Sequence, residues 1–190
     1  MKKRILVLGA VLALVAALVI PTAALAGDTA VTGNPAATID ITVPGGFAMT
    51  PLTPGTTPTS SGKTITVSAN KIGWLVTATD DNVAVTNGKM TAYSVGDALY
   101  DPTTPAKLAS VMGVIGVSAT GATGATVALP TGGAILTGTA AVSGQAYTVT
   151  FSQPVSYLDV VLTGDGITPT VTGEEPDTYR IVVTFTGSTP

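Results

Sequence analysis

The chain contains neither cysteine nor histidine among its 190 residues. Without cysteine it can form no disulfide, no thiolate metal site and no cysteine nucleophile. Without histidine it lacks the usual general base near neutral pH, which excludes Ser/His/Asp and Cys/His catalytic arrangements. Paired carboxylates still permit glycosidase chemistry, but the acidic residues fall mainly in predicted turns, away from any aromatic cluster. We therefore expect a protein that is not an enzyme and holds no cofactor.

Charged side chains are also scarce, at 10% of the residues, whereas threonine, valine, alanine and glycine are abundant. Few charges and many β-branched residues favour strands over helices. A surface of this composition suits contact with a wall, a polymer or a neighbouring subunit better than free solvent.

The longest apolar run, Ile5–Ile20, follows three basic residues at positions 2–4. Pro21 ends the run, and Ala-Leu-Ala at 24–26 supplies a small-x-small cleavage pattern. These features predict a secretory signal peptide over residues 1–26, removed on export, and a flexible mature N-terminus over residues 27–36. The alternative is an uncleaved membrane anchor, but the run is shorter than the ~20 residues that a spanning helix needs.

Cleavage would change the charge balance, because three of the eight Lys and Arg residues lie in the predicted signal peptide. The mature chain would keep five basic against eleven acidic residues, a net charge of −6. We therefore expect no nucleic-acid partner, and no membrane partner once the signal peptide is gone. A secreted domain without disulfides must draw its stability from its core, and a mature chain of this size buries roughly 70% of its unfolded surface.

The stretch Lys63–Asn82 holds the only tryptophan, Trp74. Apolar residues alternate with threonine and serine along it, which places apolar side chains on one face of a strand. We expect Trp74 to be a core residue because the residues two positions before and after it are apolar and lie on the same face of the strand. The predicted inward residues are Ile65, Val67, Ile72, Trp74, Val76 and Ala78.

An N-terminal strand is predicted over Ala37–Val43, with Ile39, Ile41 and Val43 facing inward. The Pro- and Thr-rich segment 49–62 follows it and cannot form a central strand, so we interpret it as a crossover loop rather than an interdomain linker. The N-terminal strand either pairs within its own domain or completes the sheet of a neighbour. We expect internal pairing, because most secreted sandwiches close on themselves.

Further strands are predicted along the rest of the chain. Asn87–Gly88 is a two-residue hairpin signal between predicted strands over Val83–Val85 and Lys89–Tyr93. A second hairpin turn is predicted at Thr131–Gly133, between strands over 126–129 and 134–136. Lys107–Ser118 suits a strand, with a short helix over 105–112 as the alternative. The remaining strands are Gln145–Phe151, Val155–Leu162, which we expect to be buried on both faces, and Tyr179–Thr186. Short strands separated by turn signals predict an all-β fold, a single Ig-like or Greek-key β-sandwich over residues 37–190.

Asp80, Asp81 and Asn82 form the one acidic cluster that follows a predicted strand. With Asp40, Asp97 or Asp101 they could hold calcium through oxygen ligands alone. The spacing does not match an EF-hand loop, and Asx side chains also stabilise turns by bonding backbone amides. We expect Asp80, Asp81 and Asn82 to form a turn rather than a calcium site. The acidic residues at 174, 175 and 177 are weaker candidates for calcium binding.

The segment Gly73-Trp74-Leu75-Val76-Thr77, followed by an acidic turn, resembles the first signature of WxL-type bacterial cell-surface domains. The C-terminal stretch Tyr179–Pro190 resembles their closing strand. Val76 stands where the motif has leucine, and Phe185 and Gly187 replace the second tryptophan and its leucine. The resemblance implies a secreted β-sandwich that associates non-covalently with a cell envelope.

We therefore expect a secreted structural or adhesion-type module of the cell surface, with a cell-envelope polymer or another surface protein as its partner. One alternative is a carbohydrate- or cell-wall-binding module, for which Tyr93, Tyr100 and Tyr157 are the available aromatics. Another is self-assembly into an extracellular filament, with the N-terminal strand as donor.

Overall fold

The computed structural model describes residues 33–49, 51–95, 98–100, 106–162 and 178–190. The chain divides into two compact units, Met1–Pro35 and Ala36–Pro190. In the first unit only residues 33–35 are described, and they are exposed coil. The predicted signal peptide and most of the predicted flexible segment 27–36 thus lie outside the described residues. Every described strand belongs to the second unit.

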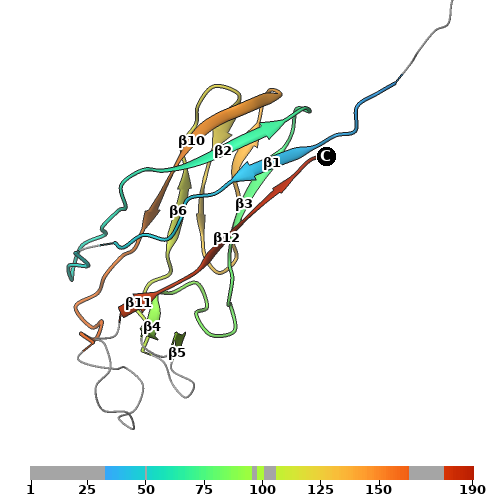
Figure 1. Cartoon of the computed structure of the whole chain (residues 1–190). Coiled ribbons are helices and arrows are strands. Elements are labelled where there is room, and N and C mark those ends of the chain that lie inside the picture. The colour runs from blue at the N-terminus through green and yellow to red at the C-terminus, as the bar shows by residue number, and fades with distance from the viewer. Residues whose placement is uncertain (1–32, 50, 96–97, 101–105, 163–177) are drawn as a thin grey trace, which may run out of the picture. The chain divides into compact units, whose positions relative to one another are not determined.

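The described part of the second unit is all-β and contains no helix, hence no helical segment long and apolar enough to cross a membrane. Its antiparallel strands form three sheets (Figure 1). The larger sheet has the order β1-β2-β10-β6-β8, the smaller sheet β12-β3-β9-β7, and a short third sheet β11-β4-β5. The bounds are β1 Ile39–Thr42, β2 Lys63–Ala69, β3 Leu75–Asp80, β4 Thr91–Ser94, β5 Leu99–Tyr100, β6 Gly113–Gly116, β7 Ala122–Gly124, β8 Thr126–Ala128, β9 Gly133–Gly138, β10 Val142–Ser152, β11 Thr178–Arg180 and β12 Val183–Ser188.

The larger and smaller sheets pack face to face around one apolar core, so the predicted β-sandwich is confirmed. The core draws on inward residues of both sheets, as the alternation of apolar and hydroxyl side chains predicts. Its least exposed large side chains are Trp74, Tyr147, Ile65, Leu108, Leu129, Ile135, Leu136, Val67, Val76, Val114 and Val149.

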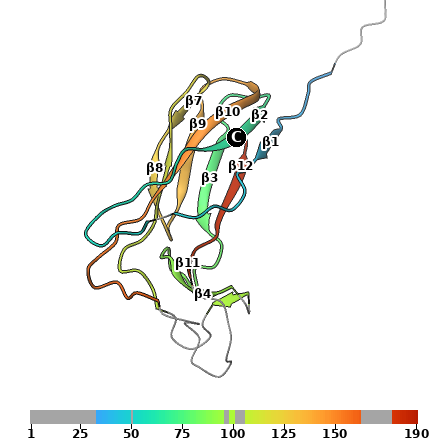
Figure 2. The same ribbon diagram turned by 60° about the vertical axis from the view of Figure 1, so that its left-hand side comes forward.

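One side of the sandwich is joined by a strand that changes sheets (Figure 2). β7 pairs with β9 in the smaller sheet, and β8, directly after it, pairs with β6 in the larger sheet. At the change, the Ala125 amide donates to the Ile135 carbonyl (2.9 Å) and the Ala125 carbonyl accepts from the Gly116 amide (2.8 Å). Position 116 must be glycine, because a Cβ there would lie 2.0 Å from the Ile135 oxygen. On the other side the edge strands are β1 and β12.

Two pairs of predicted neighbours separate into different sheets. The Trp74 stretch contains two strands, β2 and β3, joined by a turn over residues 70–73. The turn breaks the alternation, so Ile72 is 61% exposed instead of buried. The hairpin predicted at Thr131–Gly133 is also wrong, because β8 and β9 pair in opposite sheets and the segment is a crossing between them.

The predicted strand Val83–Val85 is a series of turns. The amides of Val85 and Thr86 both donate to the Asn82 carbonyl (3.0 and 2.9 Å). Asn87 and Gly88 then take positive φ angles of 49° and 76° and lead into β4. Their backbone thus has the left-handed conformation that Asn-Gly favours, but it ends a helical turn and not a strand.

Three other predictions need correction. Val43 is exposed because it lies past the end of β1. Within Lys107–Ser118 only Gly113–Gly116 is strand, and no helix forms over the described part of 105–112. Val155–Leu162 is a loop with exposed apolar side chains rather than a buried strand. Gln145–Phe151 is confirmed within β10, with Tyr147, Val149 and Phe151 buried, and Tyr179–Thr186 divides between β11 and β12.

Candidate functional site

Among the residues that resemble the WxL signature, Trp74 and Val76 belong to the buried core and Phe185 packs against it. Trp74 is fully buried directly before β3, and its indole Nε1 donates to the Ala140 carbonyl (2.9 Å). Val76 is fully buried, and Phe185 on β12 packs edge-on against Phe151, with ring centroids 6.2 Å apart. Leu75 is partly buried and pairs with Ser188. The prediction that Trp74 is a core residue is confirmed.

Asp80 ends β3 and organises the turn that follows. Its buried carboxylate accepts hydrogen bonds from the amides of Asn82 (3.1 Å) and Gly88 (2.7 Å) and from the Thr86 hydroxyl. Asp81 is exposed, and its carboxylate accepts from the Thr184 hydroxyl (2.9 Å). The acceptor atoms of Asp80 are therefore used by nearby donors, as an Asx turn requires.

The other acidic candidates do not gather around this turn in the described part of the chain. Asp40 lies on β1 in the larger sheet, whereas Asp80 ends a strand of the smaller one. Within the described ranges no group of three or more acidic side chains is placed to hold a metal ion. Asp97, Asp101 and the acidic residues at 174, 175 and 177 lie outside these ranges.

The three tyrosines considered for carbohydrate stacking do not form one platform. Tyr93 on β4 and Tyr100 on β5 pack edge-to-face, with centroids 5.1 Å apart. The Arg180 guanidinium on β11 lies 4.2 Å from the Tyr93 centroid and covers one face of that ring. Burial raises the pKa of Tyr100, partly offset by the positive charge of Arg180. Tyr157 lies elsewhere, on the Val155–Leu162 loop.

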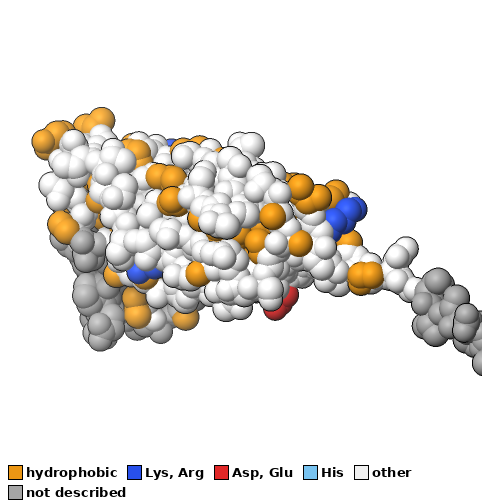
Figure 3. All heavy atoms as spheres, turned by 90° about the horizontal axis from the view of Figure 1, so that it is seen from above, with side chains coloured by type: hydrophobic (Ala, Val, Ile, Leu, Met, Phe, Trp, Pro, Cys, Tyr) orange, Lys and Arg blue, Asp and Glu red, His pale blue; other side chains and the backbone are white. Residues whose placement is uncertain are grey.

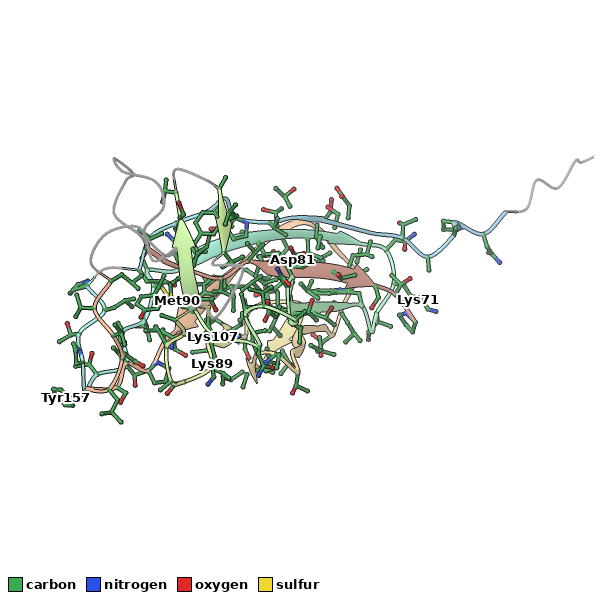
Figure 4. All side chains as sticks on the ribbon, turned by 90° about the horizontal axis from the view of Figure 1, so that it is seen from below. Lys71, Asp81, Lys89, Met90, Lys107 and Tyr157 are labelled. Atoms are coloured by element: carbon green, nitrogen blue, oxygen red, sulfur yellow. The ribbon has the colours of Figure 1, made fainter. Side chains whose placement is uncertain are left out.

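That loop carries the four most exposed large apolar side chains of the described residues, and we call Val155–Leu162 the apolar loop. Tyr157 is 83% and Leu158 89% exposed, and Val160 and Val161 are also exposed. Figure 4 shows Tyr157 at the end of the sandwich opposite Lys71, pointing outward. The face seen in Figure 3 carries few charged side chains, and apolar groups are scattered over it.

Hydrogen bonds hold the apolar loop in place. The Asp159 carboxylate accepts from the amides of Ser156 (2.7 Å) and Ala109 (2.7 Å). Val155 exchanges backbone bonds with Gly55 and Thr56 (2.8 and 2.9 Å). The loop therefore has a fixed backbone and leaves Tyr157, Leu158, Val160 and Val161 exposed. The Ser-x-x-Asp spacing at 156–159 is the sequence signal for this turn, and it is a capping pattern.

An apolar cavity of about 1080 Å³ lies beside the loop. Buried Phe151, Met112 and Leu108 are among the core residues that line it. Residues 44–49, Val160–Leu162 and the junction of β11 and β12 also line it. The Tyr179 hydroxyl donates to the Val160 carbonyl (2.8 Å), which ties the loop to β11. Burial raises the pKa of Tyr179, and the nearby negative charge of Asp159 adds to the shift.

Comparison with known proteins identifies no relative of this chain: no family model, curated protein or solved structure matches it. The candidate site is therefore defined by its own geometry, an ordered apolar loop beside an apolar cavity at one end of a β-sandwich.

Proposed function

We propose that this chain is a secreted, non-catalytic module of the cell surface with a structural or adhesive role. In this proposal it associates non-covalently with the envelope through the apolar loop, and its partner is an apolar patch on another surface protein. The WxL-like sequence pattern supports the location, and the lack of histidine and cysteine supports a non-catalytic role.

The observation that carries the proposal is the exposure of Tyr157, Leu158, Val160 and Val161 on a loop with a fixed backbone. Contiguous exposed apolar side chains are unfavourable in water and mark interaction sites. Fixing the loop before binding lowers the entropy lost on association. Aliphatic side chains match an apolar protein surface better than the hydroxyls of a polysaccharide.

A binding assay with isolated cell envelopes of the source organism tests the proposal. Tyr157→Ser combined with Leu158→Ser removes the most exposed apolar side chains, and we expect bound protein to fall at least about tenfold, a loss of roughly 1.4 kcal/mol. The matched control is Ile72→Ser with Val117→Ser, which removes exposed apolar residues elsewhere. Equal binding by the loop variant and the control, with both folded, would refute the apolar loop as the docking site.

The carbohydrate-binding alternative is favoured only by the exposed ring of Tyr157, which packs beside Gly55. Protease treatment of the envelopes separates the two functions, since it removes protein partners and leaves wall polysaccharide. Binding that survives the treatment and is lost in Tyr157→Ser would favour the carbohydrate-binding module.

A further inference from the structure

The edge strand β1 has few ties to the rest of the sandwich. It is four residues long and pairs only with β2, from Ile39 opposite Ala69 to Thr42 opposite Thr66. Its inward side chains, Ile39 and Ile41, are only partly buried where they pack against the core. They also lie against Gly187 of β12, where an added Cβ would come within 3.1 Å of Ile39 and 3.2 Å of Ile41. β1 thus spans the opening between the two sheet edges (Figure 1).

The surface that receives β1 is built by β2 and Asn70, and we call Thr66–Asn70 the β1 seat. The Asn70 side chain accepts from the Thr38 amide (2.8 Å) and donates to the Ala36 carbonyl (2.7 Å). The Asn70 amide donates to the Thr38 carbonyl (3.3 Å). The seat therefore recognises an extended backbone followed by an Ile-x-Ile pattern, which is the sequence of β1.

A short glycine hinge connects β1 to the next anchored residue. Gly45 and Gly46 follow Pro44, and a Cβ at either glycine would meet no atom within 4 Å. Phe47 is held again, 4.9 Å from the Phe151 ring and 4.5 Å from the Lys63 ammonium. Gly45 and Gly46 are therefore exposed with free space at their Cβ positions, and glycine allows many backbone conformations.

The buried apolar residues all come from other segments, and none lies on β1. Release of β1 exposes Ile39 and Ile41 and leaves the outer edge of β2 unpaired. An exposed strand edge of this kind is a template for a strand from another chain.

We propose that the β1 seat of one copy accepts β1 of a second copy, so that the chain assembles by strand exchange. The contacts in the exchanged form are those of the closed monomer, with only the hinge changed, which makes such exchange a low-cost route to association. Donor strand and seat are different surfaces of one chain, so exchange yields a closed dimer or an open run of copies. The inference does not depend on where the protein resides.

Single cysteine variants test the exchange directly, because the chain has no cysteine of its own. Thr42 and Thr66 are opposite each other across β1 and β2. The full chain carrying Thr42→Cys is mixed with a mass-tagged chain carrying Thr66→Cys, refolded together from urea at high protein concentration, and oxidised. The matched control mixes Thr64→Cys with Thr148→Cys, which are opposite each other across β2 and β10 in the middle of the sheet.

The expected result is a disulfide-linked heterodimer for the Thr42–Thr66 mixture, at least about ten times more abundant than for the control. Equal amounts in both mixtures would mean random collision or general unfolding, and no heterodimer in either would mean that β1 does not exchange. Both results overturn the proposal.

A hinge variant gives a second measurement that needs no cysteine. Deletion of Gly45 and Gly46 strains the closed monomer, because β1 and Phe47 are both anchored, but it does not strain the exchanged form. We expect this variant to elute as dimers or larger species in size exclusion with light scattering. A folded, strictly monomeric deletion variant would overturn the proposal even if the cysteine variants fail to fold.

Discussion

The rings of Trp74 and Tyr147 lie 5.7 Å apart between centroids, inclined at 58°. Trp74 directly precedes β3 of the smaller sheet, and Tyr147 lies on β10 of the larger sheet, so this contact joins the two halves of the sandwich. Both polar atoms are satisfied: Trp74 donates to the Ala140 carbonyl, and the Tyr147 hydroxyl donates to the Thr120 carbonyl (3.0 Å). The pair therefore packs without leaving a buried donor unpaired.

Trp74→Ala should lower the free energy of unfolding by about 3–5 kcal/mol, because it leaves a large cavity and removes the contact with Tyr147. Urea denaturation measures the loss. Gly138→Ala provides a related test, since a Cβ there would lie 2.2 Å from the indole; we expect a loss of about 1–3 kcal/mol from overpacking. The control is Gly45→Ala, where a Cβ meets nothing. Near wild-type stability of Trp74→Ala would contradict the core assignment.

Asp80→Ala should destabilise the chain by about 2–3 kcal/mol, because it leaves the amides of Asn82 and Gly88 without their acceptor. Asp81→Ala, which removes one exposed acceptor of the Thr184 hydroxyl, should cost less than about 1 kcal/mol. Thermal unfolding of both variants gives the comparison. We also expect a chelator to leave the melting temperature of the wild type unchanged, and a fall of many degrees would instead establish a bound metal.

Asp159→Ala should loosen the apolar loop with little change in global stability. The substitution removes the acceptor of the Ser156 and Ala109 amides, while the core remains intact. Local opening controls proteolysis in such a loop, so chymotrypsin should cut after Tyr157 or Leu158 several-fold faster than in the wild type. Asp40→Ala, on β1, is the control. An unchanged cleavage rate would show that other contacts hold the loop.

The stability of the chain should fall in alkaline solution. Burial raises the pKa of the Tyr147 hydroxyl above its ordinary value. An unfolded tyrosine ionises at about pH 10. Between that pH and the pKa of the folded state, the folded state therefore binds more protons than the unfolded state. The contribution of Tyr147 to the free energy of unfolding is therefore complete below about pH 10, and it is lost as the pH rises through the pKa of the folded state. Urea unfolding across this range measures the slope, which should be shallower in Tyr147→Phe. An identical slope would assign the effect to other groups, such as Tyr100 and Tyr179, whose pKa values are raised in the same direction.

The sequence alone predicted the all-β class, the buried position of Trp74 and the turn at Asp80. These features depend on local rules: alternation selects the apolar face of a strand, and an Asx side chain bonds the amides that follow it. Gln145–Phe151 illustrates the first rule, since its alternating apolar residues are the buried ones of β10.

Tertiary structure decided which sheet each strand joins. β2 and β3 follow each other in the chain and lie in opposite sheets, as do β8 and β9. The alternation of apolar and polar residues tells which face of a strand is apolar. Both sheets turn an apolar face toward the same core, so a strand with this pattern fits equally well in either sheet. The choice depends on main-chain bonds to distant partners, as at Ala125 between Gly116 and Ile135.

The candidate site also depended on tertiary structure. The apolar run Val155–Leu162 has the composition of a buried strand, yet Asp159 fixes it as a loop by accepting from Ala109, 50 residues earlier in the chain. Hydrophobicity measures the free energy that burial would release, but burial requires a surface to pack against, and only the folded arrangement of the other segments supplies or withholds that surface.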